Sequence, residues 1–307
     1  MAETAKVLDP QVKERLDKIN WKSLEDTFGI TREQIEKRPQ VAKDLAYGAM
    51  TDLIPFSKNG ISGEISLRAQ PTPNASGKLW DVKGYTKLEP KTADDKLFFY
   101  GEEVYSKTAK KNLFEMTSWE GSDGKRKQGR ANASTGIPVS IAFPKRDENG
   151  QIVKNEKGEI EREPKKSFIM SIHQPTNQLV GIEVEKLKAK LQNSPNGVSM
   201  YGVKLTDAQV EAVAMGKAVT LQGCKNSKGE KFDSFPGLGT PVQFDVAKMT
   251  LVAVHPTALK QAMQMGAGAT TEKVEQPKER TSKKTTKKTT ETQQQEVGPK
   301  KTNRLTH

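Results

Sequence analysis

Hydrophobic and polar residues recur in the same pattern twice along the second half of the chain. Met170 to Gln192 and Val242 to Gln264 align without a gap at an offset of 72, sharing L-V-[GA]-[IV]-x4-L-K-x2-[LM]-Q. Upstream, Gly136 to Ile141 matches Gly216 to Leu221 at an offset of 80. We therefore predict two copies of one supersecondary unit, and such a repeat must be established before a fold is assigned.

The second copy indicates what each unit contains. Thr206 and Gln209 form a capping box at the start of a short amphipathic helix, which Gly216 ends. Three β-prone runs and the start of a final helix follow, at Ala218 to Leu221, Val242 to Phe244, Leu251 to Val254 and His255. Because strands joined by hairpins form an antiparallel sheet, we predict the α+β class, with helices on one face of the sheet.

The strands of the first copy should occupy the same places as those of the second. The strands expected to correspond are Val139 to Phe143, Phe168 to His173 and Leu179 to Ile182 in the first copy, and Val219 to Gly223, Val242 to Val246 and Leu251 to Val254 in the second. Each triplet should be followed by a helix that packs through Leu187 and Leu191, or through Leu259 and Met263.

The first copy has eight extra residues between its strands. Asp147 to Lys154 (DENGQIVK) is followed directly by Asn155 to Arg162 (NEKGEIER), and both units carry turn residues. Only one of two turns eight residues apart is expected to close a given hairpin, and the segment has no apolar face to bury. We predict a mobile projecting arm from Arg146 to Lys166 that contributes little to folding. The lysines available to a partner would be Lys154, Lys157, Lys165 and Lys166.

Short helical patterns fill the N-terminal segment. Three helices are expected before Pro39, starting at Asp9, Trp21 and Thr31. The third follows the second after a turn at Gly29, which is the spacing of a helix-turn-helix whose second helix enters a major groove. The side chains facing DNA would then be Arg32, Gln34, Lys37 and Arg38. The alternative is a structural helical hairpin with a glycine turn.

β-Prone and basic sequence follows the helices. A hairpin is expected from Ile61 to Tyr85 and a further strand from Leu97 to Tyr100. Ser106 caps a helix whose outward lysines would be Lys107, Lys110 and Lys111. The loop from Glu120 to Gly136 is rich in glycine and holds the cations Lys125, Arg126, Lys127 and Arg130. It lacks the Walker phosphate-binding spacing, so it is either a solvated loop or a contact for a nucleic-acid backbone.

Beyond residue 266 the chain becomes rich in threonine and lysine and loses its aromatic residues. Such sequence cannot bury enough apolar surface to fold, so we predict a disordered basic tail that either solubilises the chain or binds polyanions loosely. Its candidate nucleic-acid contacts are Lys283, Lys284, Lys287 and Lys288. The predicted organisation is a helical N-terminal segment (1–55), a β-rich region with a basic helix (56–130), the first repeat unit with its arm (131–195), the second repeat unit (196–266) and the tail (267–307).

Composition and charge narrow the function. Of the 307 residues, 34% are hydrophobic and 29% are charged, and the net charge of +12 favours a polyanionic partner, nucleic acid first. Neither a signal-peptide pattern nor an apolar run long enough to span a bilayer is present, so we expect a cytoplasmic protein with no membrane partner. The single cysteine, Cys224, leaves no internal disulfide.

The residue types used in catalysis and metal binding form no recognisable motif. His173 and His255 stand near strand ends without a His or Cys partner at ligand spacing, and His307 is terminal. The G-x-S-x-G nucleophile pattern is missing, and the adjacent carboxylates Asp94 and Asp95 would point to opposite faces of a strand. We therefore expect no catalytic residue, no metal, no cofactor and no enzymatic activity.

Two groups of residues carry a resemblance to known families. Leu205-Thr206-x2-Gln209-Val210-x5-Gly216-Lys217-Ala218-Val219, then Lys228-Gly229 and Val242 to Asp245, resemble the domain of unknown function numbered 3945. Ile19-Asn20-Trp21-x2-Leu24 and Phe28 to Glu36 resemble the companion family numbered 4099. The resemblance implies a protein of Bacteroidetes conjugative or mobilisable elements with an accessory role in DNA handling, since 3945-type domains also accompany type IA DNA topoisomerases. The insertion Pro236 to Pro241 departs from the usual run into the last motif.

Together these features predict a non-enzymatic accessory or adaptor protein of a mobile genetic element, associated with DNA or with a DNA-processing complex. In this interpretation the basic loop and the basic tail contact backbone phosphates, and the repeated units are binding modules. The alternative is a protein-binding scaffold, such as a partner of a topoisomerase or of the conjugation apparatus, with no direct nucleic-acid contact.

Overall fold

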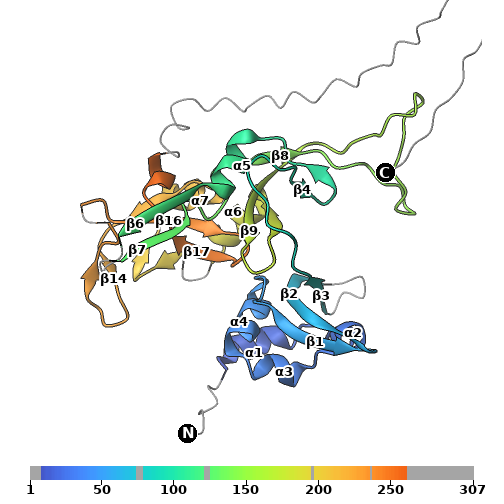
Figure 1. Ribbon diagram of the computed structural model, residues 1–307, viewed down its shortest axis with the longest axis horizontal. Helices are drawn as coiled ribbons and strands as arrows, with labels where there is room; N and C mark the ends of the chain where they lie inside the picture. Colours follow the sequence, from blue (N-terminus) through green and yellow to red (C-terminus); the bar gives the residue numbers. More distant parts are fainter. Residues whose placement is uncertain (1–7, 74–78, 121–124, 195–196, 236, 261–307) are drawn as a thin grey trace, which may run out of the picture. The chain divides into compact units, whose positions relative to one another are not determined.

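The N-terminal helices pack on a small antiparallel sheet (Figure 1). The computed structural model describes residues 8–73, 79–120, 125–194, 197–235 and 237–260. The first elements are α1 (Pro10–Leu16), α2 (Trp21–Phe28), α3 (Arg32–Glu36), α4 (Pro39–Tyr47), β1 (Ile54–Lys58), β2 (Ile61–Pro73) and β3 (Trp80–Tyr85). The sheet has the order β1-β2-β3, so the predicted hairpin from Ile61 to Tyr85 is confirmed. We call these elements the N-terminal subdomain.

Capping residues fix the ends of the N-terminal helices. Asn20 caps α2, and Thr31 and Gln34 form a reciprocal capping box at the start of α3. α2 ends at Gly29, whose φ of 67° lies in the left-handed region. A Cβ atom at Gly29 would lie 2.5 Å from the carbonyl oxygen of Ser57, so only glycine fits between α2 and β1.

One hydrophobic core joins these helices and strands. Leu16, Ile35 and Leu45 from the helices cluster with Ile65 and Leu67 from β2. Alternate residues of β2 face the helices because successive side chains of a strand point to opposite faces of its sheet. The core therefore crosses the division that the sequence placed at residue 55.

The two sequence repeats form two sheets of the same topology. The first copy contains β8 (Val139–Ile141), β9 (Lys166–His173), β10 (Gln178–Glu183) and α6 (Val184–Gln192). The second contains β13 (Val219–Leu221), β16 (Thr240–Asp245) and β17 (Thr250–Ala253), followed by helical residues 257–260. The middle strand is β9 in one sheet and β16 in the other, and all neighbouring strands are antiparallel. The predicted duplication and the α+β class are confirmed.

The strand register follows the sequence offset. His173 pairs with Gln178 in the first copy and Asp245 pairs with Thr250 in the second, so the hairpin register is conserved at the offset of 72. The turns also match, because Asn177 and Met249 hold the same left-handed position with φ of 55° and 50°. The outer strands β8 and β13 differ by two residues in register, which keeps the same side chains on the same face.

Each repeat unit begins earlier than the sequence indicated. A hairpin of β4 (Phe98–Phe99) and β5 (Glu102–Glu103) precedes α5 (Lys107–Phe114), and a hairpin of β11 (Ser199–Met200) and β12 (Val203–Lys204) precedes α7 (Asp207–Ala214). Both hairpins turn through a Tyr-Gly pair with positive φ, at Tyr100 (51°) and Tyr201 (52°). The residues assigned to a separate β-rich region therefore include the start of the first unit.

The first unit contains an inserted hairpin that the second lacks among its described residues. β6 (Met116–Glu120) and β7 (Arg126–Arg130) pair along their whole length between α5 and β8. The prediction that Glu120 to Gly136 is a loop was wrong for β7. Its sequence carries no alternating apolar signal, and the ladder of backbone hydrogen bonds to β6 makes it a strand. We call β6 and β7 the basic hairpin.

Residues of both units share a hydrophobic core. Ile169 and Leu187 of the first unit cluster with Val213, Val242 and Phe244 of the second. The described parts of the two repeat units are therefore packed on each other across one core.

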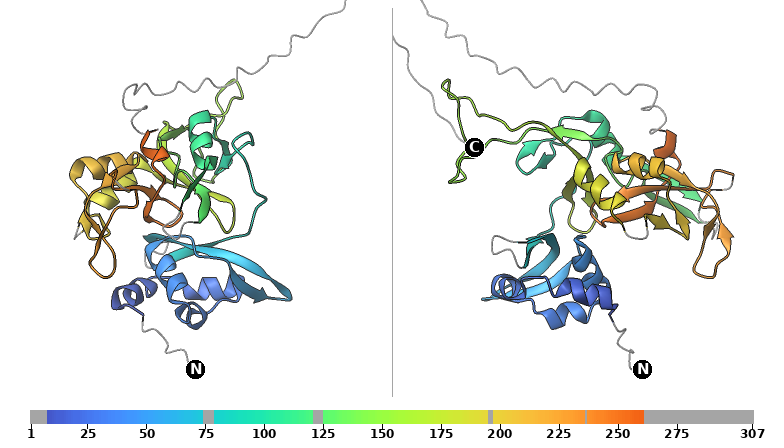
Figure 2. Two further views of the ribbon diagram at one scale, coloured as in Figure 1. Left: turned by 60° about the vertical axis from the view of Figure 1, so that its left-hand side comes forward. Right: turned by 180° about the vertical axis from the view of Figure 1, so that it is seen from behind.

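The arm of the first unit forms both of its turns. In each turn the side chain of the first residue, Asp147 or Asn155, accepts two backbone N–H bonds of 2.8 to 3.0 Å. Asn226 forms the same turn between β14 (Cys224–Lys225) and β15 (Lys231–Phe232) of the second unit. The expectation that only one turn closes a hairpin was wrong, and Figures 1 and 2 show both tips of the arm.

A ring of three backbone hydrogen bonds joins the two turns of the arm. Val153 N donates to Lys145 O, Glu161 N donates to Val153 O, and Lys145 N donates to Glu161 O, at 2.9, 2.9 and 2.8 Å. The three residues stand eight positions apart, which is the length of the duplicated sequence unit. Each unit therefore forms its own short hairpin at a common junction. Of the lysines predicted to bind a partner, Lys154, Lys157 and Lys165 are exposed. Lys166 forms an ion pair with Glu163, with 3.7 Å between Nζ and Oε2.

Deleting residues Asp147 to Lys154 should change the free energy of unfolding by less than about 1 kcal/mol, because a loop shortened by this length has nearly the same closure entropy. The hydrogen bonds at the junction give a second reason. In the shortened chain we expect Lys145 to take the place of Val153, so that Glu161 N donates to Lys145 O. Denaturant unfolding of the native and shortened chains measures the change. A loss of several kcal/mol would show that the arm packs against the sheet.

Candidate functional site

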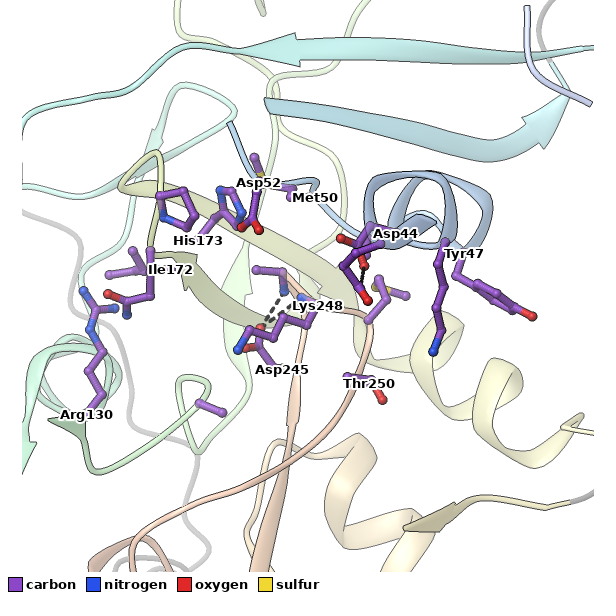
Figure 3. A pocket seen from close by; sticks show the side chains of 18 of the residues that line it. Asp44, Tyr47, Met50, Asp52, Arg130, Ile172, His173, Asp245, Lys248 and Thr250 are labelled. Atoms are coloured by element: carbon purple, nitrogen blue, oxygen red, sulfur yellow. Dashed lines mark hydrogen bonds between the residues drawn. The ribbon is translucent and has the colours of Figure 1, made fainter. Parts of the chain in front are cut away.

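A cavity of about 830 Å³ lies where α4 meets the turns after β9 and β16 (Figure 3). Its polar walls include Lys43, Asp44, Tyr47, Asp52, Arg130, His173, Gln174, Asp245 and Lys248. The backbone N–H of Met50 donates to the carbonyl oxygen of Ala247 at 2.8 Å. This bond holds the segment after α4 against the turn that follows β16. The cavity therefore joins the N-terminal subdomain to both repeat units.

His173 and Asp245 occupy equivalent positions of the two repeat units, each at the last residue of its middle strand. His173 Nδ1 lies 2.8 Å from Thr176 Oγ1, and the side chain is 5% exposed. Asp245 Oδ1 accepts from the backbone N–H groups of Ala247 and Lys248 at 2.8 and 3.2 Å. Burial lowers the pKa of His173 to about 4 and raises the pKa of Asp245. Each side chain thus stabilises the turn that follows it.

Asp44 is the carboxylate of α4 that faces the cavity (Figure 3). Gln40 Nε2 donates to Asp44 Oδ1 at 2.7 Å. Burial, with a smaller contribution from Asp52, raises the pKa of Asp44 to about 6, and the nearby Lys43 and Lys248 oppose this rise. Perturbed carboxylates in cavities are typical of functional sites, and also of structural ion networks.

The side chains of Asp44, His173 and Asp245 in the cavity are each hydrogen-bonded within their own helix or turn. His173 is hydrogen-bonded to a threonine hydroxyl, and Asp245 to backbone N–H groups of its turn. Among the described residues, no group of three or more His, Cys, Asp or Glu side chains is placed to hold a metal ion. The arrangement offers hydrogen bonds and charges of both signs to a bound molecule, which is the chemistry of recognition.

Arg130 links the cavity to the basic hairpin. Its guanidinium lies 5.4 Å from the centre of the Phe114 ring. In the amide orientation that satisfies both side chains, Gln174 Oε1 accepts from Arg130 Nε and Nη1 at 2.9 and 3.2 Å. Burial lowers the pKa of Arg130, and Asp245 opposes this change. Arg130, a predicted phosphate contact, is therefore engaged by side chains of the fold itself.

The remaining cations of the basic hairpin lie at its outer end. Lys125, Arg126 and Lys127 are all exposed. Arg126 pairs with Glu120 in the strand register, and its Nη2 donates to Ser118 Oγ at 3.1 Å. These cations, which the sequence interpretation assigned to a loop, therefore lie at the start of a paired strand.

The N-terminal candidates are mostly engaged within their own helices. Arg32 contacts carboxylates of Asp17 (2.8 Å) and Glu36 (2.6 Å), and Lys37 pairs with Glu33 at 2.7 Å. The side chain of Gln34 returns to the backbone of Thr31. α3 has 5 residues, and its predicted DNA-facing side chains serve this network. The geometry favours the structural helical hairpin; Arg38 is exposed.

The other candidate cations are not brought to the basic hairpin by any described contact. Lys107 and Lys111 are exposed on α5, and Lys110 Nζ donates to the carbonyl oxygen of Asp95 at 2.9 Å. The tail lysines Lys283, Lys284, Lys287 and Lys288 lie outside the described residues, as does Met263. Within the described part of the chain, no helix has the length and apolar character needed to cross a bilayer.

Apart from Arg130, the polar residues that line the cavity were not predicted as site residues from the sequence. His173 and Asp245 align at the offset of 72, so the repeat itself contained the signal that both end a middle strand. The sequence did not indicate that Asp44 and Asp52 line a cavity, because the cavity forms only where α4 meets turns that are distant in sequence.

Comparison with known families bears on the N-terminal subdomain. A family model described as a protein of unknown function (DUF4099) matches residues 15–80. The match runs from the end of α1 to the first residue of β3, and it confirms the predicted likeness of this segment. No curated protein and no solved structure matches the chain. The likeness of the second repeat unit to the 3945 family stays a prediction.

Proposed function

We propose that this protein is a non-enzymatic accessory protein that binds nucleic acid, with the basic hairpin as a phosphate contact. The observation that carries the proposal is the placement of Lys125, Arg126 and Lys127 on an exposed hairpin that is inserted into one of two like units. Cations that contact phosphates release condensed counterions, which favours association.

The charge of the whole chain supports the same partner. The net charge is +12, and the residues from Glu272 onward contribute a net +5 of it. A field of this sign attracts polyanions over a distance of about 8 Å at physiological salt. The resemblance to families of mobile genetic elements supports DNA, or a DNA-processing complex, as the setting of this binding.

Replacing Lys125, Arg126 and Lys127 by glutamine should weaken binding to duplex and single-stranded DNA. Log K falls as the logarithm of the salt concentration rises. The magnitude of this negative slope should decrease by about 2 to 3, because each lost phosphate contact contributes about 0.7 to 0.9. Fluorescence anisotropy of labelled oligonucleotides between low and physiological salt measures the slope.

A matched control changes the same charge elsewhere, with Lys154, Lys157 and Lys165 of the arm replaced by glutamine. This control should lose less affinity than the hairpin variant. Absence of binding by the native chain at both salt concentrations would refute nucleic-acid binding. Equal losses in the two variants would refute the role of the hairpin.

A protein-binding scaffold is the second candidate, and exposed aromatic side chains favour it. Phe98, Tyr100 and Tyr105 are 51%, 70% and 45% exposed around the β4–β5 hairpin. Aromatic side chains are enriched in protein interfaces. A pull-down from the native host with nuclease treatment distinguishes the candidates, because partners such as a topoisomerase or a conjugation protein survive nuclease only if they bind the protein directly.

A further inference from the structure

Three partly exposed rings lie in a row beside the basic hairpin. Trp119 is in β6, His255 follows β17, and Phe235 lies in the segment between β15 and β16. The centres of the Trp119 and His255 rings are 6.1 Å apart, and those of His255 and Phe235 are 5.4 Å apart. The fold therefore joins rings from three distant segments into one surface, which we call the ring row.

The basic hairpin fixes the position of the tryptophan. A Cβ atom at Gly129 would lie 3.0 Å from Trp119 Cη2, so the indole lies across β7 where the strand has no side chain. Thr117, on the same face of β6, lies close to His255, with 3.5 Å between Oγ1 and Nδ1. The row is thus held by the hairpin on one side and by the end of the second unit on the other.

Packing alone is the simplest explanation for three neighbouring rings. In that case the rings would belong to a buried cluster, because burial of their apolar surface is what stabilises such contacts. None of these rings is a member of the hydrophobic clusters in the described part of the chain. All of them remain partly exposed, so the row is not a fully buried packing cluster.

Cations border the ring row. Lys127 stands directly opposite Trp119 in the strand register. Arg126 and Trp119 line an open hollow of about 430 Å³ with Ser118 and Glu120. Lys260 lies near enough to His255 to contribute to lowering its pKa, after the larger effect of burial. Glu120 is the acidic side chain of the hollow and pairs in register with Arg126.

We propose that the ring row binds the unpaired bases of single-stranded nucleic acid while the bordering cations contact its phosphates. The inference rests on the proposed nucleic-acid binding and adds which form is preferred. Base faces are open to aromatic rings only when the bases are unpaired, and every base has such a face. The row therefore predicts a preference for single strands over duplex with little dependence on sequence.

The test compares Trp119→Leu and Trp119→Phe in the full chain, with Tyr100→Leu as a control at an exposed ring elsewhere. The probes are labelled oligo-dT, oligo-rU and a mixed-sequence duplex DNA. Trp119→Leu should weaken binding to the single strands about tenfold and change duplex binding less than about twofold, since a stacking contact corresponds to a factor of about 5 to 150. Trp119→Phe should retain most of the affinity, and Tyr100→Leu should retain all of it.

A second variant guards against misfolding at Trp119. Phe235→Leu removes the ring at the other end of the row. It should also weaken binding to single strands more than binding to duplex DNA. Thermal melting verifies that each variant is folded. If single-strand binding is unchanged in both variants, or falls together with duplex binding, the ring row is not a stacking surface although nucleic-acid binding stands. If the native chain binds none of the probes, both proposals fail.

Discussion

Between pH 7 and pH 4.5, the free energy of unfolding should fall more steeply in an Asp44→Asn variant than in the native protein, and less steeply in a His173→Asn variant. The two side chains line the same cavity, and burial shifts their pKa values in opposite directions. Their effects on stability therefore have opposite signs on acidification.

His173 makes the folded state sensitive to acid. Its pKa is about 4 in the folded chain and about 6.5 when unfolded, so the unfolded chain takes up the proton first as the pH falls. The stability that His173 contributes is fully present above pH 6.5 and is lost between pH 6.5 and 4. One unit of pKa corresponds to about 1.4 kcal/mol, so about 2 to 3 kcal/mol is lost by pH 4.5.

Asp44 acts in the other direction. Its pKa is about 6 in the folded chain and about 3.8 when unfolded, so the folded chain takes up the proton first. The stability linked to this proton is fully present below pH 3.8 and is lost as the pH rises through 6. Because the carboxylate is only partly buried, solvent screening reduces its contribution between pH 7 and 4.5 to about 1 kcal/mol.

Urea unfolding of the native chain and both variants at half-unit pH steps measures these slopes. The difference between chains is informative because the other titrating groups are common to all three. In His173→Asn the amide retains a hydrogen-bonding group near Thr176, so the slope is interpretable even if the variant is less stable at pH 7. Parallel stability curves for the three chains would show that neither side chain is linked to folding.

Leu187→Ala should lower the free energy of unfolding by about 2 to 5 kcal/mol. Leu187 lies on α6, is fully buried at 0% exposure, and belongs to the core that contains residues of both repeat units. Truncation removes apolar contacts and leaves a cavity between the units, and both effects oppose folding. The measurement is denaturant unfolding followed by circular dichroism.

The equivalent residue of the second unit provides the matched control. Leu259 stands 72 positions after Leu187 and is 7% exposed in a cluster with Ala218, Val254 and Ala258. Leu259→Ala should be destabilising, and by less than Leu187→Ala, because fewer buried side chains surround the removed atoms. A smaller loss at Leu187 than at Leu259 would show that the shared core does not hold the two units together.

The hydrophobic pattern predicted the two sheets because the middle strand, the following turn and the next strand have the same spacing along the sequence in both repeat units. The offset of 72 extends through β9, its turn and β10, and the registers of the two hairpins agree with it. The Tyr-Gly hairpins escaped detection because the inserted basic hairpin separates them from their sheet in the first unit. The sequences of β4–β5 and β11–β12 share only the turn and the following cap, which is too little for a pattern of apolar positions.

The candidate surfaces were predictable only as far as they are local in sequence. Lys125, Arg126 and Lys127 are consecutive, so composition alone indicated a basic site. Trp119, His255 and Phe235 meet through tertiary contacts. Trp119 is more than a hundred residues from the other two rings, and its local sequence does not predict them as neighbours. The partial burial of Arg130 likewise depends on Phe114 and Gln174, which lie in other elements.

The junction of the arm has a consequence for how this protein can vary. Its hydrogen bonds join Lys145, Val153 and Glu161, so a gain or loss of eight residues adds or removes one hairpin and leaves the strands at its base in register. Other changes in length disturb the junction itself. We therefore expect the number of eight-residue units to set the number of turn tips on the arm without any change in the sheet that anchors it.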